Sequence, residues 1–319
     1  MLNHNESFFI LTVDLEPDNA ISSFNIKISH RGMEEGLNKL LELLDKHDIK
    51  ATFYATAITA EHFPKTIRKL REQGFEIGCH GYKHEFLGVP FISISTPKLS
   101  LYKLSLKDLT LLSIEEINST IVKATQIVSN IAGVKIKSFK APWMTLHPKA
   151  YKTLENLGYK VSTSIPVWKY GGPLHPYHPS TEKWLEEGDS AILELPISVD
   201  PLPMVYMDYR VLHSDFSSYT LRTMGLDFVL RALKRIIIAQ KALGGPIILV
   251  FCTIISEYMS APLNLKSNIW INIGNKLLNL MDKFLTEVKR KIKPEFLTAI
   301  ELADLWEENY CNKHGKLHT

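Results

Sequence analysis

Gly74-Phe75-Glu76-Ile77-Gly78-Cys79-His80-Gly81-Tyr82-Lys83-His84 is a short apolar run that leads into two histidines four residues apart. On a helix or a tight turn, side chains at i and i+4 lie on one face, so both imidazoles can reach one metal ion. A protein-bound divalent cation usually needs a third ligand, often a carboxylate. The candidate lies upstream, in Thr12-Val13-Asp14-Leu15-Glu16. A His-x-x-x-His pair alone is also compatible with a solvated or core-packed pair.

The acidic cluster and the histidine pair each follow a short β-like run. Residues 8–13 are almost wholly apolar and end at Asp14, and residues 75–79 end at His80. Such apolar runs are typical of strands buried on both faces. Because α/β proteins place ligand-binding groups at the carboxyl ends of parallel strands, we expect the two clusters to face the same site.

Strand-like and helical patterns alternate along the whole chain. The predicted strands are 8–13, 51–55, 75–79, 135–139, 159–163, 191–195, 246–255 and 296–299. The predicted helices are 32–47, 64–73, one opened by the capping box at 113–116, one between Pro148 and Gly158, 221–243, 270–291, and a short one at the end. About seven alternations without a glycine-rich phosphate motif favour an α/β fold of the (β/α) barrel type.

No repeat, linker or low-complexity tract divides the chain, so we expect a single domain over residues 1–319. Residues 87–112 interrupt the alternation and read as a surface excursion, either a lid or binding loop or a plain decorated loop. With 45% hydrophobic and 22% charged residues, the composition is that of an ordinary globular protein.

The charge, the apolar runs and the cysteines exclude several classes of protein. A net charge of +3 gives no reason to expect nucleic acid as a partner. The longest apolar run, 246–255, is about half the ~20 residues that a membrane-spanning helix requires. Residues 1–7 lack a basic region followed by an apolar core, and the three cysteines form no paired framework. We therefore expect a cytoplasmic protein without a membrane span; the sequence assigns no oligomeric state.

The order of the motifs resembles the polysaccharide deacetylase family, also called the NodB-homology family. The resemblance rests on the segments 12–16, 51–53, 74–80 with His84, and Phe139-Lys140-Ala141-Pro142, and covers about residues 8–255. It implies a distorted (β/α) barrel with about seven strands. It also implies hydrolysis of N-acetyl groups on an amino sugar or glycan, with a divalent metal, commonly zinc.

The resemblance also implies roles for individual residues. Asp14 matches the catalytic base, and His80 and His84 match the two metal-binding histidines. The commonest motif has an aspartate where this chain has Leu15. In the Asp-x-Glu version of the motif, Glu16 takes the metal role, and residues i and i+2 of a strand do point to the same side. Lys140, Pro142 and Trp143 match the motif that orients the base and binds substrate.

Three later positions depart from the family. Lys140 replaces an arginine and cannot form a bidentate fork with a carboxylate. Ser162 stands where an aspartate is expected, and Cys252-Thr253-Ile254-Ile255 stands where the catalytic-acid histidine is expected. His175, His178 and His213 are the candidate replacement acids, and Trp143 and Trp168 are candidate platforms for a sugar ring, or packing residues.

The departures leave three functions open. The first is a metal-dependent hydrolase of an N-acetylated amino sugar or glycan. The second is a catalytically degenerate barrel that retains the metal and binds a glycan or a partner. The third is a hydrolase of non-sugar amides.

Overall fold

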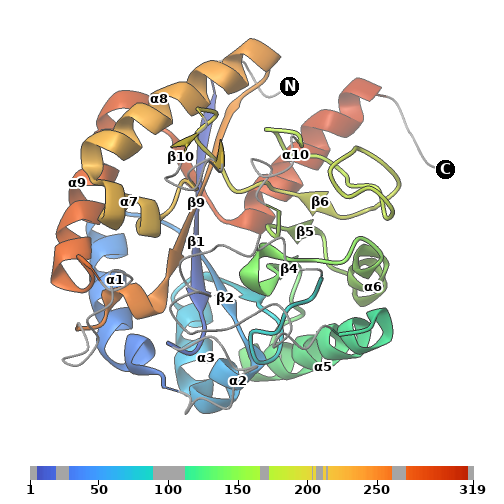
Figure 1. Ribbon diagram of the computed structural model, residues 1–319. Coiled ribbons are helices and arrows are strands. Elements are labelled where there is room, and N and C mark those ends of the chain that lie inside the picture. The colour runs from blue at the N-terminus through green and yellow to red at the C-terminus, as the bar shows by residue number, and fades with distance from the viewer. Residues whose placement is uncertain are drawn as a thin grey trace.

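Strand β1 (Ser7–Leu15) lies at the centre of the fold and pairs with three other strands. The computed structural model in Figure 1 describes residues 6–18, 29–88, 112–165, 172–202, 204–205, 211–212, 215–260 and 271–314. β9 (Ile247–Ile254) pairs with β1 along nearly its whole length. β2 (Thr52–Ala55) pairs with its carboxyl half and β10 (Glu295–Leu297) with its amino half. A strand has two edges, and β9 occupies one edge of β1. β10 and β2 therefore lie one after the other along the opposite edge.

The remaining strands extend the sheet in the order β10-β1-β2-β3-β4-β5-β6, and all are parallel. Their bounds are β3 (Glu76–Cys79), β4 (Ser138–Phe139), β5 (Val161–Ser162) and β6 (Leu193–Glu194). Past β6 the chain reaches β9, where the Ser198 N–H donates to the Val250 carbonyl (3.1 Å) and the Val250 N–H donates to Ser198 Oγ (2.9 Å). These contacts curl the sheet into a distorted barrel, which confirms the predicted (β/α) fold.

The helices surround the sheet (Figure 1). Their bounds are the π-helix η2 (Gly32–Gly36), α1 (Leu37–Lys46), α2 (Ala57–His62), α3 (Pro64–Glu72), α5 (Ile114–Ala132), η4 (Pro142–Met144), α6 (Ala150–Leu157), α7 (Ser218–Met224), α8 (Leu226–Leu243), η6 (Ile255–Tyr258), α9 (Asn275–Ile292) and α10 (Ala299–His314). A short antiparallel pair joins β7 (Met204–Val205) to β8 (Val211–Leu212). Among the described helices, none has a stretch that is both long and apolar enough to cross a bilayer.

Several predicted boundaries were wrong. The helix predicted over 221–243 is two helices, because Gly225 adopts a φ of 85° that breaks the run. The helix predicted from residue 32 begins as a π-helix, α2 was missed, and the last helix has 16 residues rather than being short. The predicted capping box of α5 is present, with Ser113 and Glu116 bonded reciprocally. Most of the excursion at 87–112 lies outside the described residues.

Alternate residues of β1 point into the barrel and out toward the helices. Phe9, Leu11 and Val13 join the large core between the sheet and the helices, whereas Phe8 and Ile10 join a second cluster with Ile248 and Val250 of β9. The second cluster also includes Val161 of β5 and Leu193 of β6, strands on the other side of the sheet, so it fills the barrel interior. Residues Leu302, Ala303 and Trp306 of α10 pack into the same cluster. Because the period of a strand is two, Asp14 and Glu16 continue the inward row.

Two residues of the stretch 74–84 serve the barrel itself. A Cβ at Gly78 would lie 2.4 Å from the Tyr54 ring, so only glycine fits there. Glu76 accepts hydrogen bonds from Thr52 Oγ1 (2.9 Å) and from the Ile300 N–H (3.0 Å) in the first turn of α10. Glu76 thereby satisfies a free N–H at a helix start and joins α10 to β2 and β3.

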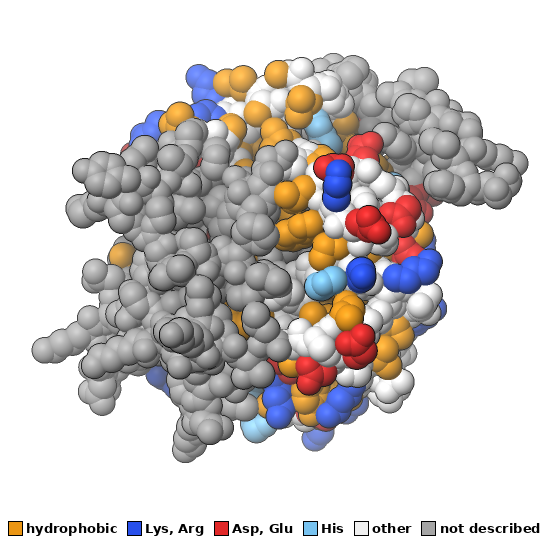
Figure 2. Space-filling model, turned by 45° about the vertical axis from the view of Figure 1, so that its right-hand side comes forward, with side chains coloured by type: hydrophobic (Ala, Val, Ile, Leu, Met, Phe, Trp, Pro, Cys, Tyr) orange, Lys and Arg blue, Asp and Glu red, His pale blue; other side chains and the backbone are white. Residues whose placement is uncertain are grey.

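Acidic and basic side chains are interspersed on the described part of the face in Figure 2. This distribution agrees with the small net charge of +3.

Candidate metal centre

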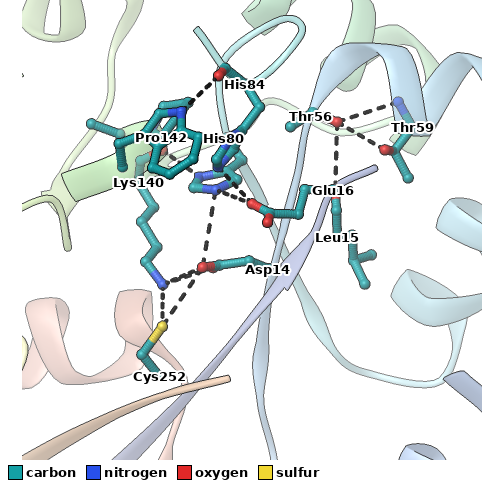
Figure 3. A network of polar contacts seen from close by, with 12 residues as sticks. Asp14, Leu15, Glu16, Thr56, Thr59, His80, His84, Lys140, Pro142 and Cys252 are labelled. Atoms are coloured by element: carbon teal, nitrogen blue, oxygen red, sulfur yellow. Dashed lines mark hydrogen bonds and ion pairs between the residues drawn. The ribbon is translucent and has the colours of Figure 1, made fainter. Parts of the chain in front are cut away.

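Glu16, His80 and His84 come together at the carboxyl ends of β1 and β3, where Figure 3 shows their side chains converging. Glu16 Oε2 lies 2.6 Å from His84 Nε2 and 3.3 Å from His80 Nε2, and all three side chains are buried. Within the described part of the chain, these residues form the one group of three whose ligand atoms lie within 4.8 Å of one another. One carboxylate and two imidazoles are the donors that zinc accepts, so the residues fit the predicted metal.

The loop after β4 fixes the orientation of His80. The Nδ1 atom of His80 lies 2.8 Å from the Lys140 carbonyl oxygen. Because a carbonyl oxygen can only accept a hydrogen bond, Nδ1 carries the proton. In the neutral form of the ring, which is the form that binds a metal, the lone pair is therefore on Nε2, the atom that faces Glu16. A hydrogen bond of this kind orients most metal-binding histidines in proteins.

Asp14 lies beside the cluster, with Oδ2 4.0 Å from His80 Nε2. Lys140 Nζ donates to both of its carboxylate oxygens, at 2.7 and 2.8 Å, and also contacts Cys252 Sγ at 2.8 Å. The Cys252 thiol is itself 3.6 Å from Asp14 Oδ2 (Figure 3). Asp14, Lys140 and Cys252 thus form a buried cluster whose members come from β1, from the loop after β4 and from β9.

Burial and neighbouring charges act against each other in this site. Burial tends to raise the pKa of Glu16, but the adjacent imidazoles, His84 foremost, hold it well below its usual value. Burial tends to lower the pKa of Lys140, but the Asp14 carboxylate raises it above the usual value. Burial and the Asp14 carboxylate raise the pKa of Cys252 to about 12, although Lys140 opposes this shift, so Cys252 is a neutral thiol at pH 7.

A further buried carboxyl group, that of Glu194, lies on β6. Glu194 Oε1 accepts the backbone N–H groups of Ser164 (2.6 Å) and Ile165 (2.8 Å), and Oε2 accepts the Tyr151 hydroxyl (2.8 Å). Ser162, where the family pattern has an aspartate, is the register partner of Glu194. Sequence reasoning missed Glu194; its one signal was a single acidic residue inside the apolar run 191–195.

The structure places the candidate replacement acids as follows. His175 Nε2 lies 3.1 Å from the carbonyl of Pro246, the residue before β9, whereas Asp14 pairs with Ile254 at the other end of that strand. His175 therefore lies at the opposite end of the barrel from the site. His178 lies between Tyr177, which forms an isolated antiparallel β-bridge with Glu194, and Pro179, which forms one with Glu187. His213 and Trp168 lie outside the described residues.

Pro142 and Trp143 lie next to the segment that carries His80 and His84. Pro142 is buried and contacts the position where a Cβ on Gly81 would lie, at 2.9 Å. Trp143 is half-buried, and its ring contacts two other rings, those of His84 and Phe86. Its predicted role in binding substrate stays a prediction.

The comparisons with known proteins agree with these motifs. The family model for polysaccharide deacetylase matches residues 4–162. The peptidoglycan-N-acetylglucosamine deacetylase of Bacillus cereus is 26% identical over 105 residues, which are 33% of this chain and 30% of that protein. The peptidoglycan deacetylase of Helicobacter pylori is 20% identical over 132 residues, 41% of this chain and 38% of that protein. The chain thus matches less than half the length of these relatives.

Solved structures of low sequence identity share the fold. A Mycobacterium smegmatis protein described as a polysaccharide deacetylase superimposes with a TM-score of 0.63 at 15% identity, over 97% of this chain and 92% of the other. The Puue allantoinase superimposes with a TM-score of 0.61 at 13% identity, over 98% and 93% of the two chains.

Proposed function

We propose that this chain, which belongs to the polysaccharide deacetylase family over residues 4–162, is a metal-dependent amide hydrolase that deacetylates an N-acetylated amino sugar or glycan. The observation that carries the proposal is the convergence of Glu16, His80 and His84, with Asp14 4.0 Å from His80. Metal ligands and a neighbouring carboxylate are the groups that hydrolysis of an unactivated amide requires.

The three ligands suit zinc first. A bound divalent ion supplies positive charge that lowers the pKa of a water molecule and stabilises an oxyanion. His80 and His84 would each offer an imidazole nitrogen and Glu16 a carboxylate oxygen, which would leave a fourth position for water.

Asp14 serves as the general base in this proposal. Its carboxylate lies within reach of the position that the three ligands surround, and it accepts the proton of the attacking water. Lys140 donates to both oxygens of Asp14 and compensates for its charge in a buried place. A lysine in this position neutralises and orients the carboxylate without the planar fork of an arginine.

Proton donation to the departing amine is the weak step. Cys252 lies beside Asp14 where the family pattern has a histidine, and its pKa of about 12 makes it a poor acid at pH 7. Because a positioned general acid contributes typically about 10²–10⁴-fold, we expect slow hydrolysis. The same observation favours one alternative function, a barrel that binds metal and a glycan without turnover.

Metal analysis and an acetate-release assay test the proposal together. The purified protein is analysed for bound metal, then assayed on a panel of N-acetylated amino sugars, chitin oligomers and non-sugar amides. We expect one metal ion per chain and acetate release that Asp14→Asn abolishes while metal stays bound. Metal binding without turnover on any amide would replace hydrolysis by the binding function. Absence of metal in the loaded wild type would refute both.

A further inference from the structure

The loop that follows β4 contacts both histidines of the Glu16-His80-His84 cluster. The Lys140 carbonyl accepts from His80 Nδ1, as described above. Three residues later, the Trp143 indole N–H donates to the backbone carbonyl of His84 at 3.0 Å. Trp143 therefore acts on the backbone of His84, whereas Lys140 acts on the ring of His80.

The backbone at both ends of this hydrogen bond is unusual. His84 has a φ of 68°, Trp143 a φ of 59° and Met144 a φ of 54°. Residues with a Cβ rarely adopt this left-handed region, and they do so where the surrounding structure holds them. The Trp143–His84 hydrogen bond joins two such positions, so each holds the other in place.

Ring contacts reinforce the same pair. The Trp143 and His84 rings lie 4.9 Å apart at 52°, and Phe86 stacks on Trp143 at 5.1 Å and 23°. A sugar platform needs an indole face open to the substrate. Here two protein rings already contact the indole, which favours a role inside the protein.

The Trp143 loop is anchored in turn from β5 and β6. The Ala141 N–H donates to Ser164 Oγ at 2.8 Å, and Glu194 accepts the Ser164 N–H. The loop is therefore held by residues of β6 and of the segment after β5 as well as by the histidine segment.

We propose that Trp143 is a positioning residue for the metal centre, whose indole N–H holds the strained backbone of His84 so that Nε2 faces Glu16. This inference rests on the metal site of the proposed function. In this inference the indole of Trp143 strengthens metal binding and does not serve as a platform for a sugar. Removing a group that orients a metal ligand typically weakens metal affinity by about 10–100-fold.

Three variants separate the hydrogen bond from the packing. Trp143→Phe removes the N–H and part of the ring. Benzothienylalanine, inserted at position 143 by nonsense suppression, replaces only the N–H by sulfur and keeps the shape of the ring. Phe86→Leu is the matched control, because it removes the stacked ring and keeps the N–H donor. Zinc affinity of each apoprotein is measured by competition with a chromophoric chelator, after circular dichroism has verified the fold.

We expect zinc affinity to fall by at least tenfold in both position-143 variants and to stay within about twofold in Phe86→Leu. A loss in Phe86→Leu equal to that of the benzothienylalanine protein would assign the effect to packing and overturn the inference. Unchanged zinc affinity with a raised KM for a sugar substrate would make Trp143 a platform. A wild type that binds no zinc would refute the proposed metal site and this inference with it.

Discussion

Glu194→Gln should change how the stability of the protein depends on pH. Glutamine has the shape of the carboxylic acid but no titrating proton. Its amide oxygen can keep the bonds from the Ser164 and Ile165 N–H groups, and its NH₂ group can donate to the Tyr151 oxygen. The variant therefore removes the ionisation of Glu194 and little else.

The pKa of Glu194 sets the size of the effect. Burial raises it from 4.5 to about 7, against the hydrogen bonds that Ser162, Tyr151 and two backbone N–H groups supply. At ~1.4 kcal/mol for each pKa unit, the ionised form costs the folded state about 3 kcal/mol. None of these four donors is a cation, and Tyr177 also faces the carboxyl group.

The sign follows from proton binding. Between about pH 4.5 and pH 7, the folded state keeps the Glu194 proton while the unfolded state loses it, so the free energy of unfolding falls as the pH rises. The effect is complete above about pH 7. We therefore expect wild type to lose about 3 kcal/mol more than Glu194→Gln between pH 4.5 and pH 8, once groups common to both proteins cancel.

Urea unfolding at a series of pH values measures this difference. Unfolding is followed by far-ultraviolet circular dichroism, and a chelator is present throughout. Glu155→Gln is the matched control: hydrogen bonds and Lys152 lower the pKa of Glu155 despite its partial burial, so its removal should affect stability toward acid instead. Wild type and Glu194→Gln curves that run parallel from pH 4.5 to 8 would show that Glu194 titrates alike in the folded and unfolded states, which contradicts a raised pKa.

Three further predictions concern the site. Replacing both His80 and His84 by alanine should abolish zinc binding, measured by elemental analysis after dialysis; full occupancy in the double variant would remove Glu16, His80 and His84 as the ligands. Asp14→Asn should abolish acetate release with zinc retained, and zinc loss would make Asp14 a ligand. Lys140→Met should lower the free energy of unfolding by about 3–5 kcal/mol, because it leaves a buried carboxylate unpaired, and Asp14→Asn added to it should restore most of the loss in urea titrations.

The alternation of strands and helices was predictable because it depends on the local spacing of apolar residues. The same parity that places Phe8 and Ile10 inside the barrel also places Asp14 and Glu16 there, and the order of motifs brings His80 and His84 to them. The sequence therefore predicted which residues meet. The roles of these residues and the extent of the domain stay predictions.

Other parts of the site were out of reach of sequence reasoning. Glu194 reaches Tyr151 and the backbone of Ser164 across three elements, and no local pattern encodes such a network. The left-handed backbone of Trp143 runs against the preference of every residue with a Cβ, so propensity predicts the opposite. The break at Gly225 was signalled by one residue in an otherwise continuous helical pattern.

The position of β1 between its partners has a consequence for how the chain folds as it is synthesised. The two segments that carry the proposed metal ligands both precede residue 85, and β1, β2 and β3 pair in the order in which they leave the ribosome. The other edge of β1 stays unpaired until β9 has been synthesised. The Thr12 hydroxyl, for example, donates to the carbonyl of Phe251, 239 positions later. Such distant pairing is slow and leaves a strand edge exposed meanwhile. Glu16, His80 and His84, the proposed metal ligands, can therefore come together long before Cys252 is synthesised and completes the cluster around Asp14.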